Sequence, residues 1–104
     1  MMEGRPMKFR LLELFSEGEA WNYEIIPIMQ EEYRMTDKYG ADCINFDIIE
    51  ICTAGFLVRT DTKIDEDGAA YRKGALLIRY KMTVLGMNQL ETIKKNLSKK
   101  KVKA

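Results

Sequence analysis

Histidine is absent from the 104 residues of this chain, and cysteine occurs only twice, at Cys43 and Cys52. A structural zinc site needs a tetrahedral set of Cys and His ligands, which this composition does not supply. The two cysteines are nine positions apart, a spacing that matches neither a redox motif nor a zinc site. We therefore expect no metal, no cofactor and two buried free thiols.

The sequence also lacks long apolar runs. The longest has four residues, for example 75–78, whereas a helix that spans a bilayer needs about 20. The N-terminal residues contain no apolar stretch of the kind that forms a secretion signal. We expect a protein with no membrane segment, located in the cytoplasm. Its length and its 46% hydrophobic content predict one domain over residues 1–98, followed by a basic disordered tail over 99–104.

Positive charge is scarce in the first 70 residues of the chain, and negative charge is scarce in the rest. Residues 1–70 hold 7 Lys or Arg and 15 Asp or Glu, a net −8, whereas residues 71–104 hold 10 and 1, a net +9. Such polarity attracts a polyanion to the C-terminal part, so nucleic acid or an acidic protein is the favoured partner. The lysines from Lys94 onward are equally well explained as a solubilising tail.

Apolar residues at helical spacing predict two helices in the first third of the chain. The first covers residues 7–15, after Pro6, which is tolerated in a first turn. The second covers residues 21–33, and Pro27 within it has no backbone N–H. We therefore expect the second helix to be kinked or restarted at the proline.

A third helix is predicted over residues 43–54, with Asp42 as its N-cap and Gly55 as the residue that ends it. Residues 36–41 should be a polar connection. Two β-strands follow, over residues 56–64 and 76–82, joined by a turn at 65–68 and a mobile tip. By strict alternation, the packed face of the second strand consists of Leu76, Ile78, Tyr80 and Met82.

Thr83 should cap a last helix that carries an apolar stripe. The stripe consists of Met87, Leu90, Ile93 and Leu97. It is longer than a domain of this size needs to cover its own core, and a lone monomer would expose it. We therefore predict a homodimer built on the last helix, and the alternative is a stripe that folds back onto the first helix.

This order of elements predicts an α+β winged helix-turn-helix fold: three helices, a two-stranded β-hairpin wing and a C-terminal helix. Within it, the local sequence resembles the PadR-type transcriptional regulators. The matching stretches are residues 11–18 (LLELFSEG), 23–26 (YEII), 56–58 (FLV) after Gly55, and 80–83 (YKMT) with Gly86 and Leu90. The resemblance covers about residues 8–93, and other winged-helix regulators such as the MarR type share most of it.

The resemblance implies a small DNA-binding regulator whose third helix enters the major groove of double-stranded DNA. The groove-facing side would hold Ile44, Asn45, Asp47, Glu50, Ile51 and Ala54. The inward side would hold Phe46, Ile49 and Cys52. On the hairpin and its loop, the phosphate contacts would be Arg72, Lys73, Arg79 and Lys81, and Asn45 is the best candidate for a base edge.

The third helix departs from the family pattern. Residues 42–54 contain three acids and no Lys or Arg, and carboxylates beside phosphates oppose docking on DNA. The family's long C-terminal dimerisation region is also mostly missing. The alternative function is therefore a protein-interaction winged helix that docks on transcription or replication machinery through its acidic third helix. A sensor with a small-molecule effector near Trp21 is a third hypothesis.

No residue cluster predicts an enzyme. The helical glutamates have no histidine partner that would tune a pKa, so we interpret them as solvated helix faces. These are Glu13, Glu17, Glu24, Glu31 and Glu32. The acidic run at 65–68 lacks the ligand spacing of an EF-hand loop, so it predicts a hairpin turn and not a calcium site.

Overall fold

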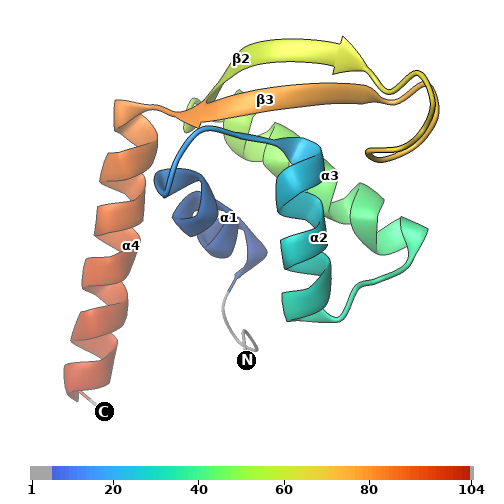
Figure 1. The fold of residues 1–104 in the computed structure, drawn as a ribbon. Coiled ribbons are helices and arrows are strands. Elements are labelled where there is room, and N and C mark those ends of the chain that lie inside the picture. The colour runs from blue at the N-terminus through green and yellow to red at the C-terminus, as the bar shows by residue number, and fades with distance from the viewer. Residues whose placement is uncertain (1–5, 104) are drawn as a thin grey trace.

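Four helices and three strands make up the part of the chain that a computed structural model describes, which is the backbone of residues 6–103 and the side chains of residues 6–96. The helices are α1 (Met7–Ser16), α2 (Asn22–Tyr33), α3 (Lys38–Thr53) and α4 (Val84–Lys103). The strands are β1 (Ala20–Trp21), β2 (Leu57–Ile64) and β3 (Leu76–Met82), which form one antiparallel sheet in the order β1-β3-β2. The protein is an α+β structure with the sheet above the first three helices and α4 beside α1 (Figure 1).

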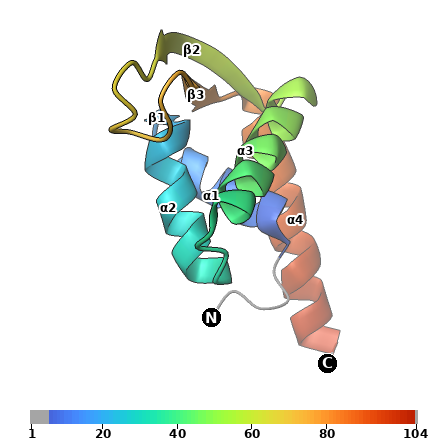
Figure 2. The same ribbon diagram turned by 90° about the vertical axis from the view of Figure 1, so that its right-hand side faces the viewer.

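Helix α1 lies at the centre of the hydrophobic core, among α2, α3, α4 and β3 (Figure 2). Five of its ten residues are buried. Tyr80 of β3 packs edge-on against Phe15 of α1, with ring centroids 5.9 Å apart. The core cluster also contains residues of α2, α3 and α4, so one hydrophobic core joins all four helices to the sheet.

A buried amide connects α2 to its neighbours. Asn22 is fully buried, and its Oδ1 accepts hydrogen bonds from the backbone N–H groups of Tyr23 and of Ile78 in β3. Its Nδ2 donates to Oδ1 of Asn45 in α3 over 3.1 Å. This single side chain therefore links α2, α3 and β3 from inside the core.

An arginine joins α1 to α2. Arg10 donates from Nε and Nη2 to the two carboxylate oxygens of Glu32, over 2.7 and 2.8 Å, and its Nη1 lies 3.4 Å from Glu13. A bidentate pair of this kind is stronger than a single neutral hydrogen bond. Glu24 is also engaged, because it accepts the backbone N–H of Trp21 at the start of α2. The interpretation of Glu13 and Glu32 as solvated was therefore wrong, whereas Glu24 is exposed as predicted.

Helix α3 starts earlier than its sequence predicts. It begins at Lys38, and Asp37 rather than Asp42 is the N-cap, since the Asp37 carboxylate accepts the N–H of Gly40 over 2.7 Å. A Cβ at Gly40 would lie 2.3 Å from the carbonyl oxygen of Met35. The glycine thus permits close packing inside the first turn of the helix, and the polar connection predicted over 36–41 is wrong.

Helix α2 runs through Pro27 without a restart. The proline removes one helical hydrogen bond, to the carbonyl of Tyr23, and the buried residues on both sides hold the helix together. Trp21 does not begin this helix. It belongs with Ala20 to β1, which pairs with β3, so the predicted two-stranded hairpin is part of a three-stranded sheet.

The other boundaries agree with the predictions to within one residue. Gly55, at φ 94°, ends α3, with its N–H on the carbonyl of Cys52 and the N–H of Phe56 on that of Ile51. This is the Schellman arrangement that a glycine in the left-handed region allows. Thr83 caps α4, because its Oγ1 accepts the N–H of Gly86 over 3.0 Å.

Alternation along β3 is confirmed only in part. Ile78 and Tyr80 are buried as predicted, but Leu76 is exposed and Leu77 is buried. Leu77 lies on the opposite face of the strand, beside Ala69 and Ala70 of the loop that connects β2 to β3. The loop therefore covers an outer-face position that alternation alone assigns to solvent.

Helix α4 divides the predicted apolar stripe. Leu90 is buried in the core, Ile93 packs against the core, and Met87 is 42% exposed. The side chain of Leu97 lies outside the described residues. The helix is described to Lys103, where the sequence predicts a disordered tail over 99–104, and Ala104 lies outside the described residues. None of the helices in the described part is long and apolar enough to cross a membrane.

Candidate functional site

The side of α3 that points away from the core is the largest candidate surface. The buried stripe of α3 consists of Ala41, Ile44, Ile48 and Ile51. At 100° per residue, the opposite side holds Tyr39, Asp42, Phe46, Glu50 and Thr53, which we call the outward face. Tyr39 is 75% exposed and Phe46 is 59% exposed.

The predicted orientation of α3 is therefore wrong at three positions. Ile44 and Ile51 were assigned to the groove-facing side and are buried, whereas Phe46 was assigned to the core and is exposed. The five residues added at the start of the helix include Ala41, which completes an inner stripe at spacings of three and four. That stripe fixes the orientation of the whole helix.

Asn45, the predicted base contact, lies at the border of the buried stripe. Its side chain is half-buried, and its Oδ1 accepts the amide of Asn22 over 3.1 Å. The amide of Asn45 is thus directed toward α2 and not along the outward face. To contact a base, Asn45 has to release Asn22, which would leave a buried donor unpaired.

Two of the three acids on α3 are paired with cations from distant parts of the chain. Glu50 binds Lys8 of α1, with Oε1 2.8 Å from Nζ. Asp42 accepts hydrogen bonds from the Tyr71 hydroxyl, over 2.6 Å, and from Nη2 of Arg72. The third acid, Asp47, is partly buried, and this burial raises its pKa above the ordinary value. The outward face therefore carries little uncompensated negative charge.

The hydrogen bonds of Asp42 shift its own pKa and that of Tyr71. The hydrogen bond from Tyr71, and then that from Arg72, lower the pKa of Asp42 below its ordinary value. Burial, together with the hydrogen bond to Asp42, raises the pKa of Tyr71 to about 12. At neutral pH the carboxylate is thus charged and the phenol is protonated, which is the combination that this hydrogen bond requires.

The β2–β3 loop, residues 65–75, is organised around one carboxylate. Asp65 is buried, and it accepts the backbone N–H groups of Ala70, Tyr71 and Arg72. Burial opposes the ionisation of Asp65, but these N–H groups outweigh it and lower its pKa. The loop is hydrogen-bonded to its own first residue and to α3. The mobility that the sequence predicts for its tip stays a prediction.

The four cations predicted to contact phosphate fall into two pairs. Arg72 is bound to Asp42, and Arg79 lies 3.5 Å from Glu19 across the sheet. Lys73 and Lys81 are exposed and have no carboxylate within ion-pair distance in the part of the chain that the structure describes. The two lysines are therefore the members of this set that form no ion pair among the described residues.

Trp21 and Tyr23 lie at the sheet and not between the first two helices. Their rings are 5.8 Å apart and half-buried, and the ammonium of Lys63 lies 4.7 Å from the Trp21 centroid and 5.5 Å from that of Tyr23. Lys63 thus occupies the aromatic surface through a cation–π interaction. An effector at Trp21 would have to displace this lysine.

A hollow lies between α2, the start of α3 and the β2–β3 loop. It encloses about 420 Å³, and its lining includes Tyr23, Pro27, Lys38, Tyr71 and Arg72. Sequence reasoning missed this site, because the lining comes from three segments that are distant along the chain. The local sequence feature that relates to this site is Asp65, an acid directly after β2. Its carboxylate binds the backbone of the loop that forms one wall of the hollow.

Neither cysteine suggests a metal or a disulfide site. Cys43 and Cys52 are both free and half-buried on α3, so the expectation that they are buried was wrong. They flank the buried stripe of the helix and do not belong to it. Within the described residues, no three His, Cys, Asp or Glu side chains are grouped closely enough to hold a metal ion.

Comparison with known proteins adds no relative to this description: no family model, no curated protein and no solved structure matches the chain. The resemblance to PadR-type regulators therefore stays a prediction that rests on its short sequence stretches. Function has to be argued from the outward face of α3, the hairpin cations and the hollow beside them.

Proposed function

We propose that the protein is a small DNA-binding regulator with a winged-helix fold and no catalytic activity. The order of elements supports this fold. Helices α2 and α3 are joined by a short turn, α3 leaves an outward face uncovered, and the β2–β3 hairpin follows directly (Figure 1). In helix-turn-helix proteins the second of two such helices enters the major groove.

The observation that carries the proposal is the internal pairing of the α3 acids. As a bare sequence, α3 presents three carboxylates to the phosphates of DNA. In the fold, Lys8 compensates Glu50 and Arg72 compensates Asp42, so two of the three acids are paired with cations. The repulsion that opposes docking on DNA is therefore reduced before DNA arrives.

The free cations define the contacts. Lys73 and Lys81 carry the phosphate contacts, whereas Arg72 and Arg79 contribute less because each already binds a carboxylate. Two contacts per protomer predict a slope of about −1.8 for log affinity against log salt. With Asn45 directed toward Asn22, the proposal implies weak sequence preference.

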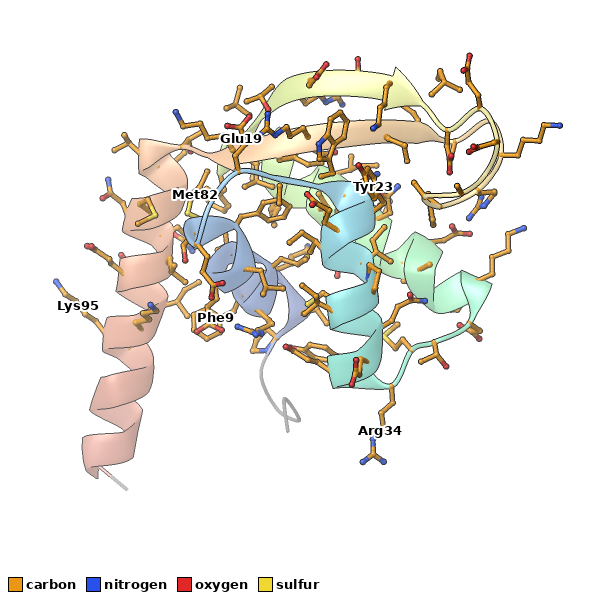
Figure 3. The ribbon with its side chains drawn as sticks, in the orientation of Figure 1. Phe9, Glu19, Tyr23, Arg34, Met82 and Lys95 are labelled. Carbon is orange, nitrogen blue, oxygen red and sulfur yellow. The ribbon has the colours of Figure 1, made fainter. Side chains whose placement is uncertain are left out.

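A salt titration tests this proposal. Fluorescence anisotropy with a labelled random duplex at ~50 mM salt should show binding at tens of micromolar protein, the range of non-specific affinity. Replacing Lys73 and Lys81 together by Ala should flatten the salt slope by roughly 1.8. Lys95→Ala is the control, because Lys95 points away from the body of the protein on α4 (Figure 3). No binding by the unaltered protein excludes the proposal, and an equal effect of Lys95→Ala moves the contact to α4.

A second candidate function, protein docking through the outward face, is favoured by Tyr39 and Phe46. Large aromatic side chains exposed on one helix are typical of protein interfaces. If DNA binding fails, Phe46→Ser should remove a partner that co-purifies with the unaltered protein. Thr53→Ser on the same face is the control and should retain that partner.

We also propose a homodimer, with its interface at the start of α4. Val84, Leu85 and Met87 are exposed there by 78%, 53% and 42%, whereas Leu90 belongs to the core. Sedimentation equilibrium at micromolar concentration should show a dimer that Leu85→Glu dissociates. Leu90→Glu should instead unfold the chain. A monomer for the unaltered protein would contradict the proposal.

A further inference from the structure

The hollow beside the start of α3 has the size and the lining of a small-molecule site. Its volume of about 420 Å³ falls within the range of roughly 300–1,000 Å³ that ligand pockets occupy. One wall is α2, with Tyr23 and Pro27, and the facing wall is the β2–β3 loop, with Ala70 and Tyr71. Tyr23 lies at the end of α2 that faces the hairpin (Figure 3). The site thus lies between two segments that are distant along the chain.

One part of the hollow's lining is apolar, beside the polar residues Gln30, Thr36 and Asp37. Ile26 and Ala41, which are both buried core residues, form part of its lining together with Pro27 and Ala70. These side chains offer a hydrocarbon surface to the apolar part of a ligand.

The charged groups of the lining favour an anion. The lining holds two exposed cations, Lys38 and Arg72, and one acid, Asp37, so its own net charge is +1. Asp42 lies outside the lining and is bound by Tyr71 and Arg72. Arg72 uses only Nη2 in these contacts, so its remaining N–H donors are free for a further acceptor. Lys38 has no carboxylate within ion-pair distance among the described residues.

We propose that this hollow binds a small amphipathic organic anion, with its apolar body between α2 and the β2–β3 loop and its charged group at Lys38 and Arg72. The proposal goes beyond DNA binding and does not depend on it.

A matched set of probes tests the charge preference. Octanoate, 1-octanol and octylamine share an eight-carbon chain and differ in their head group. Amide chemical shifts followed by NMR should show that octanoate binds at about 1 mM and at least tenfold more tightly than octylamine, with 1-octanol between them. The shifted amides should belong to residues 23–30, 36–41 and 69–72. No octanoate binding at this concentration, equal binding of octylamine, or shifts elsewhere overturns the proposal.

Three variants test the position of the ligand. Ala70→Trp places an indole into the hollow from an exposed loop position and should abolish octanoate binding. Lys38→Ala should weaken octanoate several-fold and leave 1-octanol unchanged. Lys73→Ala is the matched control, since Lys73 lies in the same loop but outside the lining, and it should leave both affinities unchanged. Unaltered thermal unfolding of each variant separates loss of the site from loss of the fold, and octanoate binding that persists in folded Ala70→Trp contradicts the proposed position.

Discussion

Asn22 and Asp65 are the two buried polar residues in the described part of the protein, and each organises a different region. Asn22 lies in the part that we call the body, which consists of the four helices and the three-stranded sheet. There its amide joins α2, α3 and β3. Asp65 lies at the hairpin end, where its carboxylate gathers the N–H groups of the β2–β3 loop. Both side chains accept hydrogen bonds from backbone N–H groups, because buried polar backbone groups need partners. The Asn22 amide is neutral, whereas the Asp65 carboxylate is charged.

The difference separates the body from the loop in their dependence on pH. A neutral amide keeps its hydrogen bonds at any pH, so Asn22 contributes equally under all conditions in which the protein folds. Asp65 and Asp42 hold the loop only when they are ionised. The body is therefore a fixed support, and the loop is the part that can be released, which suits a loop that forms one wall of a binding site.

The largest effect is expected from the body. Asn22→Ala leaves the N–H of Ile78 without its buried acceptor and Asn45 without its donor, and should destabilise the protein by about 3 kcal/mol. Thermal unfolding should shift downward by roughly 10–20 °C. Asn45→Ala, which loses one half-buried bond, is the control and should cost about 1 kcal/mol. Equal effects of the two substitutions would show that Asn22 does not organise the body.

A smaller and local effect is expected from the loop. Asp65→Ala removes the acceptor of three backbone N–H groups, so the amides of residues 70–72 should lose their protection from hydrogen exchange. The midpoint of thermal unfolding should fall by roughly 5 °C, because the body remains intact. Asp67→Ala, at an exposed position of the same loop, is the control. Loss of protection in β3 as well would contradict the separation of loop and body.

Acid should release the loop before the body. Folding lowers the pKa of both Asp42 and Asp65 below the ordinary value of 3.8, so their contribution is complete above that value and disappears as the pH falls through the lowered pKa values. As the pH falls from neutral through the lowered pKa values, the exchange protection at Tyr71 and Arg72 should fall while that at Ile78 persists. Simultaneous loss of exchange protection at all three amides would show that acid does not release the loop before the body.

The smallest effect is expected at Tyr80, whose buried hydroxyl has no hydrogen-bond partner among the described residues. Burial raises the pKa of this phenol to about 12, so it is neutral throughout the range of folding. Tyr80→Phe keeps the ring packing on Phe15 and should leave the unfolding midpoint within about 2 °C of that of the unaltered protein, or raise it. A clear decrease would indicate that the hydroxyl contributes to the body in the way that the Asn22 amide does.

Short-range signals predicted much of the fold. Gly55, Thr83 and the apolar spacing of α1 act within a few residues, so the ends of α1, α3 and the hairpin strands agree closely with the structure. The start of α3 was missed because Asp37 and Asp42 are both acceptable N-caps. The choice between them depends on the packing of Gly40 against Met35, which no local pattern reveals.

By itself, the sequence determined the helices, the hairpin and the unequal distribution of charge, because propensity, capping and hydrophobic spacing act between neighbours in the chain. Only the tertiary structure decided which charges remain free. The pairs Lys8 with Glu50 and Arg72 with Asp42 join residues far apart in the chain, and they compensate two of the three acids of α3. Electrostatic energy depends on distance in space, and distance in space is set by the packing of the core, so charge counted along the chain does not determine what this surface binds.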